Sequence, residues 1–141
     1  MSDIDCARDN TRKSLAIFRR LRYWQGIASK LTNLGINEFS AGNLSSAASC
    51  MRESMEVGIE IGDEIDFRVN LEIAAALYLR AGEPDSAAIL AGLAEARGEA
   101  IDYPHEPAES RFRQRYTEEL KILLGPRRYS QRTEEGRLLS K

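Results

Sequence analysis

The side chains that could perform chemistry in this chain are few and far apart. The single histidine, His105, stands between Pro104 and Glu106, with no serine, cysteine or second histidine at a recognised spacing. General base catalysis needs such a group held beside a partner in a pocket, so we expect no catalytic or metal-binding role for His105. Cys6 and Cys50 have no Cys-x-x-Cys spacing and lie far from the histidine, which predicts packing thiols without a disulfide or a zinc site.

Charged clusters give no stronger candidate for catalysis. The adjacent acids at 118–119 and 134–135 fall on predicted helices, where neighbouring side chains point about 100° apart and cannot share a proton or a metal. Arg111 and Arg115 share a helix face from which Arg113 is turned away, so surface charge and packing explain them better than a phosphate site. We therefore expect no enzyme activity, no cofactor and no metal.

The bulk composition is typical of one helical domain. The chain has 141 residues, 43% of them apolar and 30% charged, with few aromatics, and this length corresponds to a single core. The longest apolar run, 73–79, is much shorter than the roughly 20 residues of a membrane helix. The first residues also lack a leader pattern. We therefore expect a cytoplasmic protein that does not contact a membrane.

Charge is distributed unevenly along the chain. Residues 1–30 carry seven Lys or Arg against three acids, residues 31–107 four against fourteen, and residues 108–141 nine against five. A surface that binds nucleic acid needs one contiguous basic face. The alternation of sign therefore predicts no direct nucleic-acid partner.

An internal repeat of forty residues organises the middle of the chain. When residues 31–48 are laid over residues 71–88, six of the eighteen positions are identical, several times more than expected by chance. A fainter copy comes earlier, where Ala7, Arg12 and Ser14 each have a residue of the same type forty positions later. The identical pairs of the clear copy are Leu31/Leu71, Ala41/Ala81, Gly42/Gly82, Ser46/Ser86, Ala47/Ala87 and Ala48/Ala88.

Each copy has the pattern of two helices joined by a glycine turn. In the first copy apolar residues recur at three- and four-residue steps over 27–39, Gly42 ends the helix, and a second helix opens at Leu44. In the second copy Gly82 ends the first helix and Pro84 opens the next. Because one such pair buries too little apolar surface alone, neighbouring pairs must stack.

Beyond the second copy, Gly98 and the sequence DYPHEP interrupt the pattern. A helix is predicted from about Pro107 to Leu124, with a stripe of large apolar residues, and a shorter one from Arg127 to Leu139. The stripe consists of Phe112, Tyr116, Leu120 and Leu123.

These observations predict an all-α fold, a short right-handed α-solenoid of about seven helices in a single domain. The predicted parts are an unpaired helix at 1–22, repeat one at 23–62, repeat two at 63–102 and C-terminal helices at 107–141.

The repeat resembles a tetratricopeptide unit, in which small and large apolar residues follow a set order. The period is forty residues, longer than the standard repeat of about thirty-four, so the turn between units is longer. The residues that fit are Leu34-Gly35, Gly42, Ala47, Met51 and Ser54 in the first copy, and Tyr78, Gly82, Ala87 and Ala94 in the second.

Over nearly its full length the chain resembles the C-terminal repeat region of large bacterial regulators. Those proteins join an ATPase module to an adenylate or guanylate cyclase or to a LuxR-type DNA-binding domain. The resemblance is carried by SLAIFRRL, WQGIA, LTNLG, the AG-x-x-x-x-AA turn that occurs twice, EELKILLG and TEEGRLLS. No phosphate loop, cyclase acid pair or helix-turn-helix can be placed in this sequence. The resemblance therefore implies a regulatory repeat domain without nucleotide hydrolysis, cyclic-nucleotide synthesis or DNA binding.

We therefore expect a non-catalytic protein-interaction or scaffold domain of a bacterial regulatory protein. The first helix of each repeat would line a concave groove for a protein or peptide partner. A groove covered by the chain's own C-terminal helices is an equal alternative. The groove positions are Ser29, Thr32, Asn33, Ile36 and Ser40 in the first repeat, and Arg68, Val69, Glu72, Ala76 and Arg80 in the second.

Two further hypotheses concern the same surfaces. The unpaired first helix leaves Leu15, Ile17, Phe18 and Leu21 in need of cover, which would favour a homo-oligomer. Alternatively, the groove binds a small molecule and passes its occupancy to a fused effector, which would require a closed apolar pocket with converging polar groups.

Overall fold

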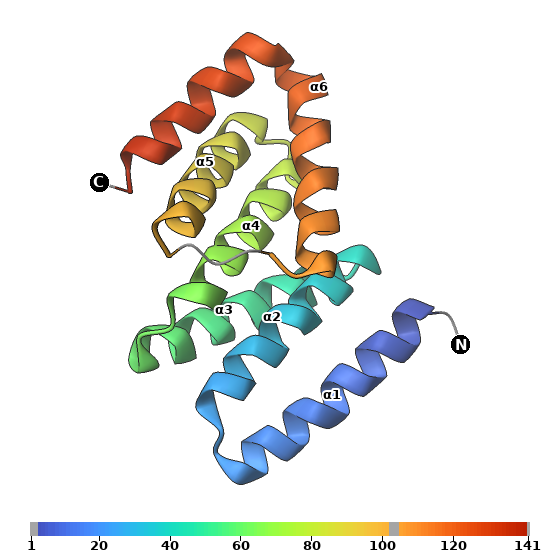
Figure 1. Ribbon diagram of the computed structural model, residues 1–141. Coiled ribbons are helices and arrows are strands. Elements are labelled where there is room, and N and C mark those ends of the chain that lie inside the picture. Colours follow the sequence, from blue (N-terminus) through green and yellow to red (C-terminus); the bar gives the residue numbers. More distant parts are fainter. Residues whose placement is uncertain (1–2, 102–104, 141) are drawn as a thin grey trace. The chain divides into compact units, whose positions relative to one another are not determined.

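The computed structural model describes residues 3–101 and 105–140, which form six helices and short connections, with no β-strand in these two ranges (Figure 1). The all-α prediction is confirmed. The helices are α1 (Asp3–Leu21), α2 (Trp24–Ser40), α3 (Leu44–Ile61), α4 (Glu64–Arg80), α5 (Pro84–Ile101) and α6 (Pro107–Leu138).

The forty-residue repeat of the sequence is also a repeat of helices. α2 and α4 each have 17 residues and begin forty positions apart, at residues 24 and 64. α3 and α5 each have 18 residues and keep the same offset, from residue 44 to residue 84. α1 ends forty positions before α3, at residue 21 against residue 61, so it corresponds to the second helix of a pair.

The turns that follow α1, α2, α3 and α4 share one geometry. In each, a residue with positive φ follows the helix: Arg22 (φ 54°), Gly42 (86°), Gly62 (72°) and Gly82 (81°). After α2, for example, the Gly42 N–H donates to the Phe39 carbonyl at 3.0 Å, and the Asn43 N–H donates to the Glu38 carbonyl at 2.8 Å. This pair of bonds is the Schellman motif, which satisfies carbonyls at the end of a helix.

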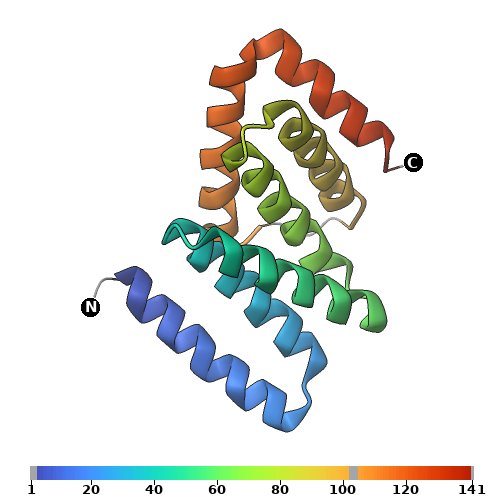
Figure 2. The same cartoon turned by 180° about the vertical axis from the view of Figure 1, so that it is seen from behind.

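The chain divides into two compact units, residues 1–73 and 74–141, with the boundary inside α4. In the first unit α1 packs on α2 and α2 packs on α3, and the three helices run alternately up and down side by side (Figures 1 and 2). Their shared core consists of Leu15, Ile27, Leu31, Leu34 and Cys50, with Phe18 and Val57 packed against it.

In the second unit α5 packs against α6, which is bent (Figure 2). The bend is at Gly125, whose φ of 79° and ψ of 160° are not helical, and Pro126 follows. The predicted count of seven helices becomes six because the two C-terminal helices join here as one element. We call residues 107–124 the first arm of α6 and residues 126–138 its second arm.

Two details of the predicted C-terminal part differ, and a third is outside the described residues. α5 continues through Gly98 to Ile101, so Gly98 does not interrupt the helix. On the predicted stripe, Phe112, Tyr116 and Leu120 are buried, but Leu123 is exposed. Residue 102, the predicted end of repeat two, lies outside the described residues.

Candidate functional site

A surface cleft of about 570 Å³ lies in the first unit, between the turn from α1 to α2 and the turn from α3 to α4. These turns occupy equivalent positions in the repeat, 22–25 and 62–65, forty residues apart. The cleft is therefore a product of the repeat itself. Its lining residues are Arg22, Tyr23, Trp24, Gln25, Ile61, Gly62, Asp63, Glu64 and Ile65.

Two neighbouring aromatic residues line the cleft and are half-exposed to solvent. Tyr23 and Trp24 are 52% and 51% exposed, and the apolar Ile61 beside them is also exposed. Tyr and Trp combine an apolar ring with a polar group, and Trp, Tyr and Arg are the residue types that carry most binding energy at interfaces. Here Arg22, Tyr23 and Trp24 are consecutive.

Tyr23 is held in place even though half of it faces solvent. Its ring meets the Phe18 ring edge to face, with 5.3 Å between centroids and 88° between planes. A Cβ at Gly26 would lie 2.8 Å from the Tyr23 Cε1 atom, so the missing side chain of Gly26 makes room for the ring. A pre-positioned aromatic loses little conformational freedom when a partner covers it.

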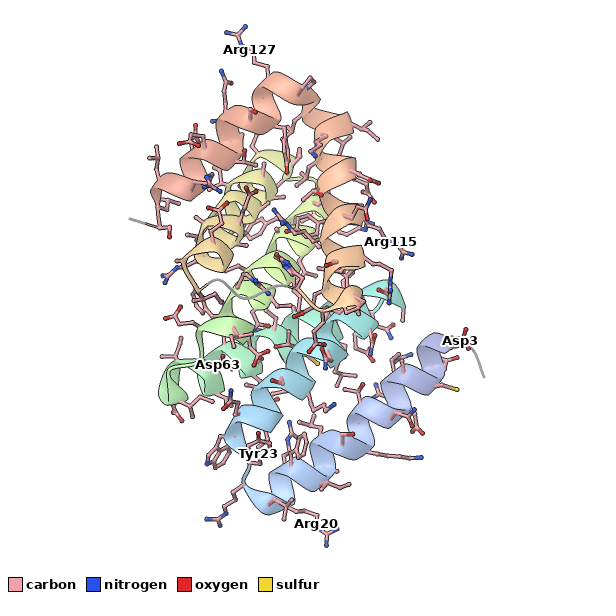
Figure 3. All side chains as sticks on the ribbon, in the orientation of Figure 1. Asp3, Arg20, Tyr23, Asp63, Arg115 and Arg127 are labelled. Carbon is pink, nitrogen blue, oxygen red and sulfur yellow. The ribbon has the colours of Figure 1, made fainter. Side chains whose placement is uncertain are left out.

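The residue forty positions after Tyr23 has a different task. Asp63 precedes α4, and its Oδ1 accepts hydrogen bonds from the Ile65 and Asp66 N–H groups at 3.0 and 3.3 Å, which caps the helix. Tyr23 makes no such cap for α2. Figure 3 shows Tyr23 and Asp63 at their two turns. The second repeat uses this position to cap the start of a helix, and the first uses it to present an aromatic ring.

The predicted groove residues of α2 differ in accessibility. Thr32 and Ile36 are buried, Ser29 and Asn33 are half-buried, and Ser40 is exposed. The Thr32 hydroxyl is occupied inside the unit: it donates to the Ala28 carbonyl at 3.0 Å and lies 2.9 Å from the Ser54 hydroxyl. Thr32 therefore joins helices in this structure and has no free surface.

This buried polar network continues from α2 and α3 into α4. The Asn70 Nδ2 donates to the Ser54 hydroxyl at 2.9 Å, and Ser54 donates to the Ala28 carbonyl at 2.9 Å. Nearer the surface, Ser29 donates to the Asp66 carboxylate at 3.0 Å. Satisfied polar networks of this kind select one arrangement of helices over others.

The predicted groove residues of α4 are mostly enclosed. Arg68, Val69 and Glu72 are buried, as is Ala76, so their side chains have no free surface. Arg80 is exposed and pairs with Glu119 of α6, at 2.7 Å. The concave groove itself stays a prediction.

The predicted self-association edge on α1 divides into two halves. Leu15 is buried in the core and Phe18 packs against it. Ile17 and Leu21 are 54% and 70% exposed, so they remain available to cover another surface.

A carboxylate that the sequence analysis overlooked attaches α1 to α2. Glu38 of α2 is 1% exposed and accepts hydrogen bonds from Arg8 (Nε to Oε1 and Nη2 to Oε2), from Arg12 at 3.2 Å and from Asn43 at 2.9 Å. Burial alone would raise the pKa of Glu38, but the hydrogen bonds from Arg8 and Asn43 and the charges of Arg8 and Arg12 outweigh it and lower the pKa. These hydrogen bonds hold α1 on α2 and fix the turn after α2, so Glu38 has a structural role.

The side chains first considered for catalysis are dispersed. His105 lies half-buried in the connection before α6. The adjacent acids make separate ion pairs, Glu119 with Arg80 and Glu135 with Arg132. Across residues 3–101 and 105–140, no group of three His, Cys, Asp or Glu is placed to hold a metal ion.

The arginines and cysteines are dispersed as well. Arg113 faces α5 and pairs with Glu95 at 2.9 Å, whereas Arg111 and Arg115 are exposed, as Figure 3 shows for Arg115. Cys50 is a buried packing thiol with a pKa raised by burial, while Cys6 is exposed. The prediction that both cysteines pack is thus wrong for Cys6.

None of the described helices combines the length and the apolar character needed to cross a membrane. No known protein family, curated protein or solved structure matches the chain.

Proposed function

We propose that this chain is a non-catalytic protein-interaction module of a bacterial regulatory protein, and that it binds a peptide segment of its partner at the aromatic cleft. The observation that carries the proposal is the side-by-side, half-exposed pair Tyr23 and Trp24 over a cleft of about 570 Å³. Arg22 and Ile61 extend the same surface.

The helix pairs support a module of the tetratricopeptide type, which we propose as the architecture. Helices of equal length recur every forty residues, and the same Schellman turn follows four successive helices. Stacked repeats of this kind present side chains from equivalent positions along one surface, which suits the recognition of extended or helical peptides.

The form of the cleft favours a peptide over a small-molecule sensor. Small molecules bind in concave sites that cover most of their surface. The four residues Arg22 to Gln25 on one side of this cleft are all exposed. An open cleft with two aromatic anchors and flanking charges from Arg22, Asp63 and Glu64 fits the centre of a protein interface better.

Trp24 makes the proposal directly measurable because it is the single tryptophan of the chain. Peptides selected from a displayed random library against the whole chain are titrated while Trp24 fluorescence is recorded, and their affinities for the natural chain and its variants are compared by the fluorescence anisotropy of a labelled peptide. We expect saturable spectral shifts and a loss of affinity of about 30-fold or more in Trp24→Ala, because anchor residues contribute about 2 kcal/mol or more.

Tyr78→Ala is the matched control, since Tyr78 is also exposed but lies on α4 outside the cleft. It should leave the affinity unchanged. Peptides that bind Trp24→Ala as tightly as the natural chain, or a selection that enriches none, would contradict the proposal.

A further inference from the structure

A stripe on the outer side of α1 matches a stripe that is covered elsewhere in the chain. Its members follow steps of four and three residues, the spacing of one face of a helix in a coiled coil. They are Asp3, Ala7, Asn10, Ser14, Ile17 and Leu21.

The central part of the equivalent stripe of α3 lies against another helix, while its two ends, Asn43 and Ile61, are exposed. Forty positions after Ala7 and Ser14 stand Ala47 and Ser54, both fully buried and identical in type. The Ser54 hydroxyl donates to the Ala28 carbonyl of α2, and a Cβ at Gly35 of α2 would lie 3.7 Å from the Ala47 carbonyl oxygen. The small residues of this stripe therefore serve to let a neighbouring helix approach closely.

On α1 the same stripe is open. Asn10, Ile17 and Leu21 are exposed, and Ala7 and Ser14 are only half-buried. A different side of α1, with Leu15, is the one that packs on α2. Among residues 3–101 and 105–140, the main packing partner of α1 is α2, which covers a side other than the stripe.

We propose that this stripe pairs with the same stripe of a second copy of the chain, α1 against α1 in antiparallel orientation. The stripe is symmetric about position 12, so that Ala7 of one copy meets Ile17 of the other, Asn10 meets Ser14, and Asp3 meets Leu21 at the two ends. In the inner pairs a small residue faces a large one and an amide faces a hydroxyl. This inference is independent of the aromatic cleft.

The charges of α1 favour the antiparallel orientation. Its first turn carries the exposed Asp3 and its last turn the exposed Arg20, whereas Asp5 pairs with Arg8 and Arg19 pairs with Glu53 inside the unit. Antiparallel pairing places the acidic end of each helix beside the basic end of the other, whereas parallel pairing would bring like charges together. Figure 3 shows Asp3 and Arg20 at the two ends of α1, with Arg20 extending away from the helix.

The expected affinity is modest. Two helices of 19 residues overlap over about 28 Å, and an interface of that length lies at the small end of the specific range. We expect a dissociation constant of roughly 10–100 µM.

Sedimentation equilibrium of the whole chain tests the pairing. Ile17→Glu combined with Leu21→Glu should raise the dissociation constant at least tenfold while leaving the helical circular dichroism unchanged, because both side chains are already exposed. Ile59→Glu is the control: Ile59 of α3 is 70% exposed, like Leu21, but is not part of the stripe. A natural chain that stays monomeric up to about 1 mM would overturn the proposal.

Disulfide trapping tests the orientation. In a Cys6→Ser background, Asn10→Cys and Ser14→Cys variants are oxidised separately and as an equal mixture. Antiparallel pairing predicts a disulfide dimer in the mixture alone, since each position faces the other and lies about 6 Å along the axis from its own copy. Dimers of equal yield from either single variant would indicate parallel pairing and overturn the proposal.

Discussion

α1 and the second arm of α6 are both single helices docked onto a helix of their own unit, but they are held by different means. α1 is attached by the apolar side chains of Leu15 and Phe18 and by the buried carboxylate of Glu38. The second arm of α6 is attached by ion pairs near the surface and by contact between helix backbones.

The backbone contact in the second unit depends on two glycines. A Cβ at Gly136 of α6 would lie 2.8 Å from the Ile89 carbonyl carbon and 2.9 Å from the Leu93 nitrogen, and a Cβ at Gly92 of α5 would lie 2.8 Å from the Thr133 Cα atom. A helix can therefore be docked either by apolar side chains that fill the interface, as in α1, or by glycines that let two backbones touch, as in the second arm of α6. An interface of side chains can adjust to a small change in side-chain volume, whereas two backbones in contact cannot accommodate an added side chain.

The largest effect is expected from Gly136→Val. The new side chain would overlap the α5 backbone, which cannot move away as a flexible side chain could, so the second arm should detach at a cost of about 3 kcal/mol. Hydrogen exchange should show lost protection over residues 127–138, with protection of α1 unchanged.

Gly58→Ala is the control for that substitution. A Cβ there would meet Asp63 at 3.7–3.8 Å, an ordinary contact, and alanine favours a helix interior over glycine by about 0.5–1 kcal/mol. An equal loss of stability in both variants would show that the backbone contact has no special role.

Glu38→Ala should have the next largest effect, in the first unit. It leaves the half-buried Arg8 without its carboxylate, and we expect a loss of about 2 kcal/mol in the free energy of unfolding. Glu53→Ala removes the exposed pair with Arg19 and should cost less than about 0.5 kcal/mol. Urea unfolding distinguishes the two, and equal losses would mean that burial of Glu38 is unimportant.

Acid should weaken the attachment of both α1 and the second arm of α6. The pKa values of Glu38, Asp85 and Glu99 are all lowered in the folded chain, the last two chiefly by hydrogen bonds from Arg128 and Arg137. Such groups stabilise the fold above their unfolded pKa of about 4, and that stability is lost as pH falls through the lower folded pKa. Unfolding free energies measured between about pH 7 and pH 2.5 should therefore decrease toward acid, with a shallower slope in Glu38→Gln.

Salt should weaken the attachment of the second arm of α6 more than the attachment of α1. Asp85 pairs with Arg128 and Arg132 at the surface, where about 1 M NaCl screens the attraction. Glu38 is shielded from solvent, so hydrogen exchange in α6 residues 127–138 should increase with salt more than exchange in α1. Equal increases in both helices would contradict the distinction between surface and buried pairs.

The sequence was a good guide to the helices because their signals are local. Glycines forty residues apart, Pro84 and the apolar periodicity predicted α2 to α5 and the turns between them. The continuation of α5 through Gly98 was missed because one glycine costs only about 1 kcal/mol, which the contacts of neighbouring residues can offset.

The candidate site was much harder to predict because it depends on contacts between distant residues. Helix register indicated Thr32 as a surface residue, but its hydroxyl is used by Ser54, twenty-two residues away. The aromatic cleft has a sequence signal, the consecutive Arg22, Tyr23 and Trp24 beside a helix end, but helix periodicity does not distinguish these residues from an ordinary turn. Of the expected self-association edge, Ile17 and Leu21 are exposed and Leu15 is buried in the core, and self-association itself stays a prediction.

The smallest effect concerns the turn that differs from its three equivalents. Arg22 has a φ of 54°, where the other three turns have glycine, and a side chain in this left-handed region costs about 1 kcal/mol. Arg22→Gly should therefore raise the free energy of unfolding by about 0.5 kcal/mol, and Arg22→Asn should lie between, since asparagine tolerates this conformation. Gly62→Ala, the reverse change in an equivalent turn, should lower it by about 1 kcal/mol. If Arg22→Gly raises stability but weakens peptide binding at the cleft, then the strained backbone at Arg22 is retained for the contacts of the arginine with a partner. Unchanged binding would mean that the strain at Arg22 only lowers the stability of the first unit.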